Sequence, residues 1–412
     1  MPNNVLLTPQ ILVRLILMNL GGYLAVARNM TKQYASEFAK PGAKVGDTVS
    51  VRKPQRFVPS VGLLYQPQAL SNVKTTITVN DVTGVHYEWD SVEKTLSLQD
   101  ANEMYGKPAA IAMAHNVNAR AAQFAAQNTF NAVGTPGTTP TLLDTYLSAG
   151  DKIVELGLPP EELLTCIVNR KMSSQFVVGQ KTLFNPAGAI GGTIKDGGIA
   201  EGVDNLLGYK WVRDQTIYTQ LGGAQGGTPQ VSGAGQGTSN GNNDTMSLNV
   251  KNLSSTVWNV GDRFTIAGIY SVHPQTRQST GDLQQFVVLA PFSAASTGSV
   301  TIAPGITPSG QYQNVTASPA DATAITLLGA ASFSSPQGLL MHKNSYAFVS
   351  IPLDTPKGPG VISSHEEEDP ETGLRASFVS FFDGVHRVEG NRLDMLDGFG
   401  VLYREMCCVI AS

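Results

Sequence analysis

The composition of the chain changes abruptly at Gly222, and this change limits the folds that the whole chain can adopt. Residues 222–242 read GGAQGGTPQVSGAGQGTSNGN, a run too polar and too rich in glycine to order itself, and it is predicted to be a linker. Beyond it, short runs of strand-forming residues recur at 246–250, 263–272, 285–289, 299–303 and 323–328. Repeated short strands between Gly, Ser and Pro turns predict a small antiparallel barrel or sandwich.

This stretch is also poor in charge. Of all residues in the chain, 15% are charged, whereas 222–345 contains only eight: Asp244, Lys251, Asp262, Arg263, Arg277, Asp282, Asp321 and Lys343. On both sides the composition is ordinary, with predicted helices at 141–156 and 170–178 and predicted strands at 164–168, 209–212, 345–353 and 376–382. Strands that alternate with helices are typical of a layered α/β domain. The β unit therefore interrupts an α/β domain that the C-terminal part completes.

The segment 108–133 is predicted to form one long helix. It is rich in alanine, has Pro108 at its first position and stops before Gly134. At 1.5 Å per residue such a helix would span about 39 Å. Arg120 is its only charged residue, and the small residues on its other faces would let neighbouring backbones approach closely. We expect a packed spine helix rather than a solvated one.

Residues 41–66 are predicted to form two extended limbs of a loop, followed by half-buried strands at 73–79 and 84–89. Pro54 blocks continuation of the first limb, and Pro59 suits an edge or an open loop. Each limb of about a dozen residues could reach roughly 40 Å at 3.3 Å per residue. The loop has too little apolar content to form its own core, so it is expected to lie against something else.

Four residues of this loop are candidate contacts with another subunit. Three of them are basic and are expected to cluster near the tip of the loop, and the fourth is aromatic: Arg52, Lys53, Arg56 and Phe57.

Residues 11–20 (ILVRLILMNL) are strongly apolar. Thr8 and Pro9 are a suitable N-cap and first position, so 9–20 is predicted to be a short helix that ends at Gly21. A helix that is apolar almost all round must be covered, and a neighbouring subunit could cover it. The alternative is a signal peptide, since Ala25-Val26-Ala27 resembles a cleavage site, but no basic residue precedes the apolar run and Arg14 interrupts it.

The beginning of the chain is basic. Arg14, Arg28 and Lys32 all precede the first acidic residue, Glu37. We expect these three residues to contact an acidic partner, because complementary charge selects partners.

The overall charge argues against a protein that grips nucleic acid. The net charge is −4 with a pI near 5.9, and the sequence has no basic run. Nucleic acid near this protein would be contained rather than bound.

We find no sequence signature of an enzyme, a metal site or a cofactor site. Walker A, G-x-S-x-G and H-E-x-x-H patterns do not occur, and GAGQG at 233–237 belongs to the linker. The run HEEED at 365–369 could hold Ca²⁺ or an acid/base pair, but such a run is more often a solvated loop. Cys166, Cys407 and Cys408 are interpreted as small apolar core residues. No cofactor is expected, and the chain is not expected to be an enzyme.

The order of these parts resembles the coat proteins of the P22-like branch of HK97-fold phages. The stretches that carry the resemblance are GDTVSVRKPQRF (46–57), VGDRFTIAGIYSV (260–272), GSVTIAPGI (298–306) and LLMHKNSYAFVSIPL (339–353). The resemblance implies an α+β HK97-like fold with an inserted antiparallel β-barrel. The implied parts are an N-terminal arm (1–40), an extended loop (41–72), a peripheral domain with the spine helix (73–134), an apical domain (135–221), the insertion (222–344) and a return to the apical and peripheral domains (345–412).

The resemblance also implies a function. Such a protein is a major capsid protein that assembles as hexamers and pentamers into an icosahedral shell around double-stranded DNA. It works with a scaffolding protein and a portal protein, without a membrane, in the cytoplasm of a bacterial host, and ends in the virion capsid. A lysine–asparagine cross-link, as in some shells of this fold, would use Lys53, but its partners cannot be identified in the sequence. The alternatives are an encapsulin-type compartment shell and, in a different class, a secreted β-rich hydrolase or binding protein.

Overall fold

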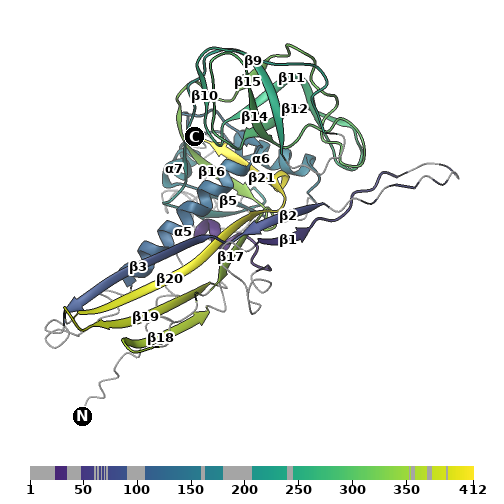
Figure 1. Cartoon of the computed structure of the whole chain (residues 1–412). Coiled ribbons are helices and arrows are strands. Elements are labelled where there is room, and N and C mark those ends of the chain that lie inside the picture. Colours follow the sequence, from purple (N-terminus) through teal and green to yellow (C-terminus); the bar gives the residue numbers. More distant parts are fainter. Residues whose placement is uncertain are drawn as a thin grey trace, which may run out of the picture. The chain divides into compact units, whose positions relative to one another are not determined.

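The computed structural model of the chain describes residues 24–34, 48–59, 62, 65, 67–68, 70, 73–90, 107–158, 163–179, 207–238, 245–351, 353, 358–368, 374–386 and 388–412. The predicted helix 9–20, Gly21 and Arg14 lie outside these residues. The chain divides into two compact units (Figure 1). The first comprises Met1–Ser50, Thr76–Ala121 and Tyr346–Gly400, and the second comprises Val51–Thr75, Ala122–Ser345 and Val401–Ser412.

A seven-stranded sheet dominates the first unit. Its longest strand, β20 (Val388–Val401), pairs antiparallel with β3 (Asp81–Asp90) and with β19 (Arg375–Asp383). The sheet order is β1-β2-β20-β19-β18, and β17 (Tyr346–Ile351) also pairs with β20. The remaining members are β1 (Thr48–Arg52), β2 (Lys74–Thr78) and β18 (Val361–Glu368). The strands predicted at 73–79, 84–89, 345–353 and 376–382 are thus confirmed.

The run HEEED was predicted to be a solvated loop, and this is wrong for residues 365–368. They form the end of β18, which pairs with β19 from Val361↔Phe381 to Glu368↔Arg375. Backbone pairing holds these residues extended, while the side chains of Glu366 and Glu368 remain exposed.

A buried ion pair joins the spine helix α5 (Lys107–Asn128) to the sheet of the first unit. Asp397 on β20 is fully buried, and both of its carboxylate oxygens accept hydrogen bonds from Nη2 of Arg120 at 2.8 Å. Burial raises the pKa of Asp397, and Arg120 opposes that shift. The only charged residue of the predicted spine helix, Arg120, therefore neutralises a carboxylate that would be costly to bury alone.

The spine helix also holds the beginning of the described chain. Oδ1 of Asn118 accepts hydrogen bonds from the backbone N–H groups of Val26 and Ala27, in the short helix α2 (Ala25–Arg28). Both Val26 and Ala27 are buried.

The helix predicted at 108–133 is confirmed as α5, but its predicted C-terminal end is wrong, since α5 ends at Asn128. Arginines from distant parts of the chain bind its terminal carbonyls: Nε of Arg263 donates to Thr129 O at 2.9 Å, and its Nη2 donates to Ala126 O. Nη1 of Arg404 donates to Asn128 O at 3.0 Å. Basic side chains stabilise helix C-termini, and α5 has none in its own last turn.

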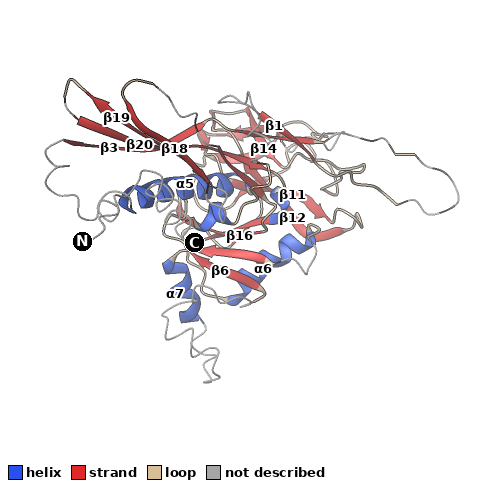
Figure 2. Ribbon diagram, turned by 90° about the horizontal axis from the view of Figure 1, so that it is seen from below, coloured by secondary structure: helices blue, strands red, loops and turns tan. Residues whose placement is uncertain are grey.

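A mixed six-stranded sheet forms one part of the second unit, in the order β4-β21-β16-β5-β6 with β7 (Thr219–Leu221) also pairing with β16. Its strands are β4 (Ala132–Val133), β21 (Cys407–Ala411), β16 (Ser334–Met341), β5 (Leu164–Val168) and β6 (Tyr209–Arg213). Helices α6 (Leu143–Glu155) and α7 (Arg170–Gly179) belong to the same part of the unit (Figure 2). Together with the sheet they enclose a core around Tyr146, Phe176 and Trp211. The predicted alternation of helices and strands is confirmed here.

An antiparallel six-stranded sheet forms the other part of the second unit, in the order β15-β11-β12-β14-β9-β8. Its strands are β15 (Ile325–Leu327), β11 (Arg263–Val272), β12 (Ser279–Val288), β14 (Gly298–Ala303), β9 (Met246–Leu253) and β8 (Gly227–Val231). Trp258, Phe264 and Phe286 lie at the centre of its core, and Trp258 belongs to a small pair of strands, β10 (Thr256–Trp258) and β13 (Phe292–Ala294). A bridge between Gln230 and Ala324 joins the two edges of the sheet.

One expectation for this region needs correction. Residues 222–242 were predicted to be an unstructured linker, but β8 lies within them and pairs with β9, because backbone hydrogen bonds do not require apolar side chains. The strand β16 lies before residue 344, yet it pairs with β5 and β21 rather than with the six-stranded antiparallel sheet. In the part of the chain that the structure describes, no helix has the length and hydropathy needed to cross a bilayer.

Replacing Arg263 should test its role at the end of α5. We expect Arg263→Met to lower the free energy of unfolding by about 2–3 kcal/mol, because hydrogen bonds from a charged donor contribute about that much and the freed carbonyls stay buried. Urea unfolding followed by circular dichroism measures this change. Lys210→Met, at an exposed position of β6, is the control. Equal unfolding midpoints for the two variants would contradict the role of Arg263.

The three thiols should be inert in the folded chain. All three are buried, and burial raises the pKa of Cys407 and of Cys408 to about 12 and that of Cys166 as well. At pH 8 we expect no reaction with a thiol reagent before denaturation and reaction of all three cysteines after it. Rapid labelling of native protein would show that this core opens.

Candidate functional site at the base of the extended loop

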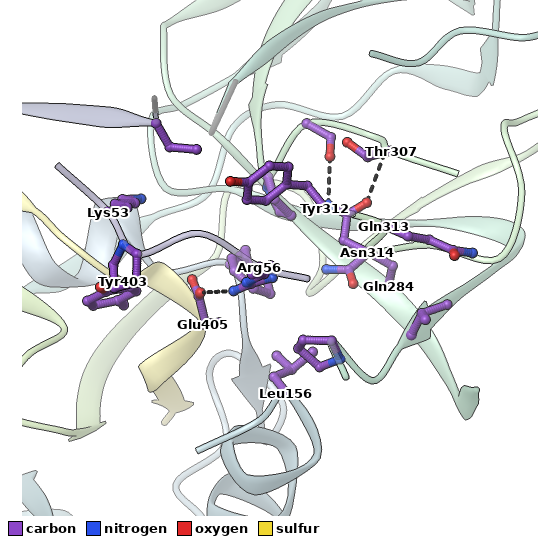
Figure 3. Close-up of a pocket in the computed structure, with 17 residues that line it drawn as sticks. Lys53, Arg56, Leu156, Gln284, Thr307, Tyr312, Gln313, Asn314, Tyr403 and Glu405 are labelled. Carbon is purple, nitrogen blue, oxygen red and sulfur yellow. Dashed lines mark hydrogen bonds and ion pairs between the residues drawn. The ribbon is translucent and has the colours of Figure 1, made fainter. Parts of the chain in front are cut away.

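A cleft of about 120 Å³ lies in the second unit where the loop leaves its strand (Figure 3). Its apolar floor includes Phe130, Leu156 and Val272. Its polar rim brings together side chains from four separate stretches of sequence: Lys53, Arg56, Gln284, Gln313, Asn314, Tyr403 and Glu405. The site therefore exists only in the folded chain.

The basic residues of the loop were predicted to cluster near its tip, and this is wrong, because they lie near its base. The backbone N–H of Lys53 donates to Val73 O at 2.9 Å, and that of Val58 donates to Oε1 of Gln68 at 2.9 Å. These bonds join the two limbs, so Lys53 and Arg56 lie on the first limb before the position at which Val58 bonds to Gln68.

Two contacts attach the first limb to the C-terminal segment. Nη2 of Arg56 lies 2.9 Å from Oε1 of Glu405, in the short 3₁₀ helix η3 (Arg404–Met406). Nζ of Lys53 lies 5.7 Å from the centre of the Tyr403 ring, a cation–π arrangement. The side chains of Arg56 and Glu405 are 36% and 26% exposed, so this ion pair contributes little to stability. Its effect is to position the first limb against the C-terminal segment.

A third basic residue, Arg277, binds the segment that carries one of the rim residues. Arg277 donates from its guanidinium to the carbonyls of Gly310 and Gln311, which fixes the segment before Asn314. Burial and, next, the positive charge of Arg56 lower the pKa of Arg277. Asn314 itself is held in place, because its Oδ1 accepts from Thr307 N at 2.8 Å and its Nδ2 donates to Gly305 O at 2.7 Å.

The other candidate contact residues have different positions. Arg52 ends β1, is exposed, and makes no ion pair with a described residue. Phe57 is 61% exposed on the loop, beside a second cleft that Arg56 also lines. The structure thus brings Lys53 and Arg56 together in one cleft and leaves Arg52 outside it.

Of the arm residues, Arg28 is exposed at the end of α2, and Lys32 follows it. The backbone near Lys32 is tied to β17, since Thr31 N donates to Tyr346 O at 3.0 Å and Thr31 O accepts from Phe348 N. Arg14 lies outside the described residues.

Sequence reasoning missed Tyr403 and Glu405. They lie more than three hundred residues from the loop, and no local pattern around YREM marks them as its partners. The arrangement offers binding groups rather than a nucleophile with its base. Within the described ranges, no group of three or more His, Cys, Asp or Glu side chains is placed to hold a metal ion.

Comparison with solved structures finds phage proteins at low sequence identity. A protein of Mycobacterium phage Che8 is 12% identical with a TM-score of 0.49, over 94% of this chain and 90% of that one. The mature capsid of bacteriophage PhiM1 is 10% identical with a TM-score of 0.41, over 90% of this chain and 82% of that one. The I-domain of the CUS-3 coat protein is 33% identical with a TM-score of 0.18, over 24% of this chain and 95% of that one.

No curated protein matches the sequence. The family described as P22 coat protein, gene protein 5, matches residues 1–409. This match includes the arm, the loop, the spine helix and both sheets of the second unit. The chain belongs to the P22 coat protein family.

Proposed function

We propose that this chain is the major capsid protein of a tailed phage and that it assembles as hexamers and pentamers into an icosahedral shell. The observation that carries the proposal is the family match over residues 1–409. The shell would enclose double-stranded DNA without sequence-specific binding, in keeping with a net charge of −4 and the absence of a basic run in the sequence. The protein would have no enzymatic role and no cofactor.

Exposed apolar side chains on the loop support a shell-forming role. Phe57, Tyr65 and Leu70 are 61%, 86% and 75% exposed. Large apolar side chains that are exposed on an extended segment favour a protein contact. The neighbouring subunit of a capsomer is the surface that would cover them.

The fold proposed with this function is HK97-like with an inserted β-barrel. The barrel is supported by the bridge between Gln230 and Ala324 and by the hydrogen bond from Val231 N to Thr323 O, at 2.9 Å, which link the two edges of the six-stranded antiparallel sheet. The proposed parts are the arm (1–40), the loop (41–72), the peripheral domain (73–134), the apical domain (135–221), the insertion (222–344) and the return (345–412). The pairing of β16 with β5 favours an end of the insertion before Ser334.

A scaffolding protein and a portal protein are the proposed partners, and the bacterial cytoplasm is the proposed place of assembly. The virion capsid is the final location. The family match favours this assignment over an encapsulin-type compartment and over a secreted β-rich hydrolase or binding protein.

Electron microscopy of the expressed chain, alone and with its scaffolding partner, tests the proposal. We expect closed shells or sheets of capsomers, because the exposed loop residues need a partner surface. Sedimentation at the same concentrations measures the assembled fraction. A chain that stays monomeric under all these conditions would exclude the shell function.

Charge reversal in the arm tests the proposed acidic partner. We expect Arg28→Glu combined with Lys32→Glu to reduce scaffold-dependent assembly about tenfold, because like charges at an interface cost several kcal/mol. The measurement is the yield of shells in a titration with scaffolding protein. Lys210→Glu, on the exposed face of β6, controls for net charge. Unchanged yield in the arm variant would remove these residues from the contact.

A further inference from the structure

Two clefts adjoin at the base of the extended loop. The first is the cleft of about 120 Å³ that Lys53 lines, and the second has a volume of about 390 Å³. Arg56, Tyr403 and Glu405 are among the residues that line both clefts, so the ion pair between Arg56 and Glu405 lies on their common wall (Figure 3). The larger volume falls within the range of roughly 300–1,000 Å³ that is usual for small-molecule sites.

Basic side chains outnumber acidic ones around these clefts. Among the described residues that line them, Lys53 and Arg56 are basic and Glu405 is acidic. Arg277 adds positive charge nearby, since burial and, next, the positive charge of Arg56 lower its pKa. A bound anion would reduce the repulsion between these basic groups, whereas a bound cation would increase it.

Glu405 shows which kind of anion Arg56 accepts. One oxygen of its carboxylate lies 2.9 Å from Nη2 of Arg56, whereas an arginine side chain can bind a free carboxylate through two parallel hydrogen bonds. The side chains of Arg56 and Glu405 are 36% and 26% exposed, so the pair opens at little cost in free energy. An incoming carboxylate can therefore take the place of the Glu405 carboxylate.

Apolar side chains lie in the clefts on both sides of this ion pair. Phe130, Leu156 and Val272 line the first cleft, and Leu156, Phe57 and Met406 line the second. Phe57 is 61% exposed, so a ligand with an apolar body would remove a large apolar surface from water. A ligand that suits the site therefore joins an acidic head to an apolar body.

We propose that the two clefts form a binding site for small organic carboxylates with an apolar body, and that Glu405 occupies the carboxylate position on Arg56 in the free chain. The bound carboxylate displaces Glu405 and so removes one of the two contacts that attach the first limb of the loop to the C-terminal segment. The apolar body lies against Leu156 and Phe57. The inference is independent of the proposed function, because binding to the full chain can be measured whether or not the chain assembles.

A titration of the full chain with para-fluorophenylacetate, followed by the fluorine NMR signal of this probe, tests the site. We expect the wild-type chain to bind the probe with a Kd on the order of 1 mM. We expect para-fluorophenylethanol, which has the same apolar body and no charge, to bind about tenfold more weakly, because hydrogen bonds to charged groups are the stronger ones.

Two substitutions at the ion pair should change the affinity for the probe in opposite directions. Arg56→Gln removes the group that binds the carboxylate, so the Kd should rise about tenfold. Glu405→Gln removes the competing carboxylate and keeps Arg56, so the Kd should fall about threefold. Arg52→Gln, at an exposed position outside both clefts, is the matched control for the first change. Glu88→Gln, at an exposed position of β3, is the matched control for the second.

Weaker binding by both ion-pair variants would overturn the proposal, because it would show that the pair only supports the shape of the clefts. Equal binding of the carboxylate and the alcohol would also overturn it, as would ion-pair variants that bind like their controls. Sedimentation of each sample ensures that wild type and variants are compared in the same state of assembly. A chain that binds the probe as expected but forms no shells would remove the proposed function alone.

Discussion

Two adjacent charged residues at the beginning of β11 hold the end of the spine helix and the segment around Gly223 against the antiparallel sheet. Arg263 binds the carbonyls of Ala126 and Thr129, while Oδ2 of Asp262 accepts from the N–H groups of Gly223 and Asn259, each at 2.9 Å. Both charged side chains are buried, and burial raises the pKa of Asp262. A buried charge without hydrogen-bond partners would cost free energy of folding. The end of the helix, the segment around Gly223 and the sheet must therefore come together in one arrangement.

The same helix end determines where the extended loop begins. Arg404 donates to Asn128 at the last position of α5, and the next residue, Glu405, pairs with Arg56 of the loop. Consecutive residues of one 3₁₀ helix thus connect the spine to the loop. The exposed ion pair between Arg56 and Glu405 can open at little energetic cost, whereas the partly buried bonds of Arg404 hold η3 against α5.

Sequence patterns located the elements whose determinants are local. The strand at 164–168 and the helix at 170–178 were predicted because their periodicity reflects one buried face. The spine helix was predicted to continue past Asn128, because the arginines that bind its terminal carbonyls, Arg263 and Arg404, lie far away in the sequence. The strands β18 and β8, the second of which lies within the Gly-rich stretch 222–242, were missed because they are held by backbone pairing, which leaves no mark in side-chain patterns. The charge of Arg56 marked it as a candidate contact residue. No feature of the sequence marks Glu405, which lies far away along the chain, as its partner.

The low number of charged residues in the six-stranded antiparallel sheet has a consequence for its stability. A part of the molecule with few titratable groups gains or loses few protons on unfolding, so apart from the contribution of buried Asp262 its stability changes little with pH. It also contains few ion pairs for salt to screen. Changes of pH or salt would therefore act on this part chiefly through buried Asp262 and through the exposed ion pair of Lys251 with Asp321.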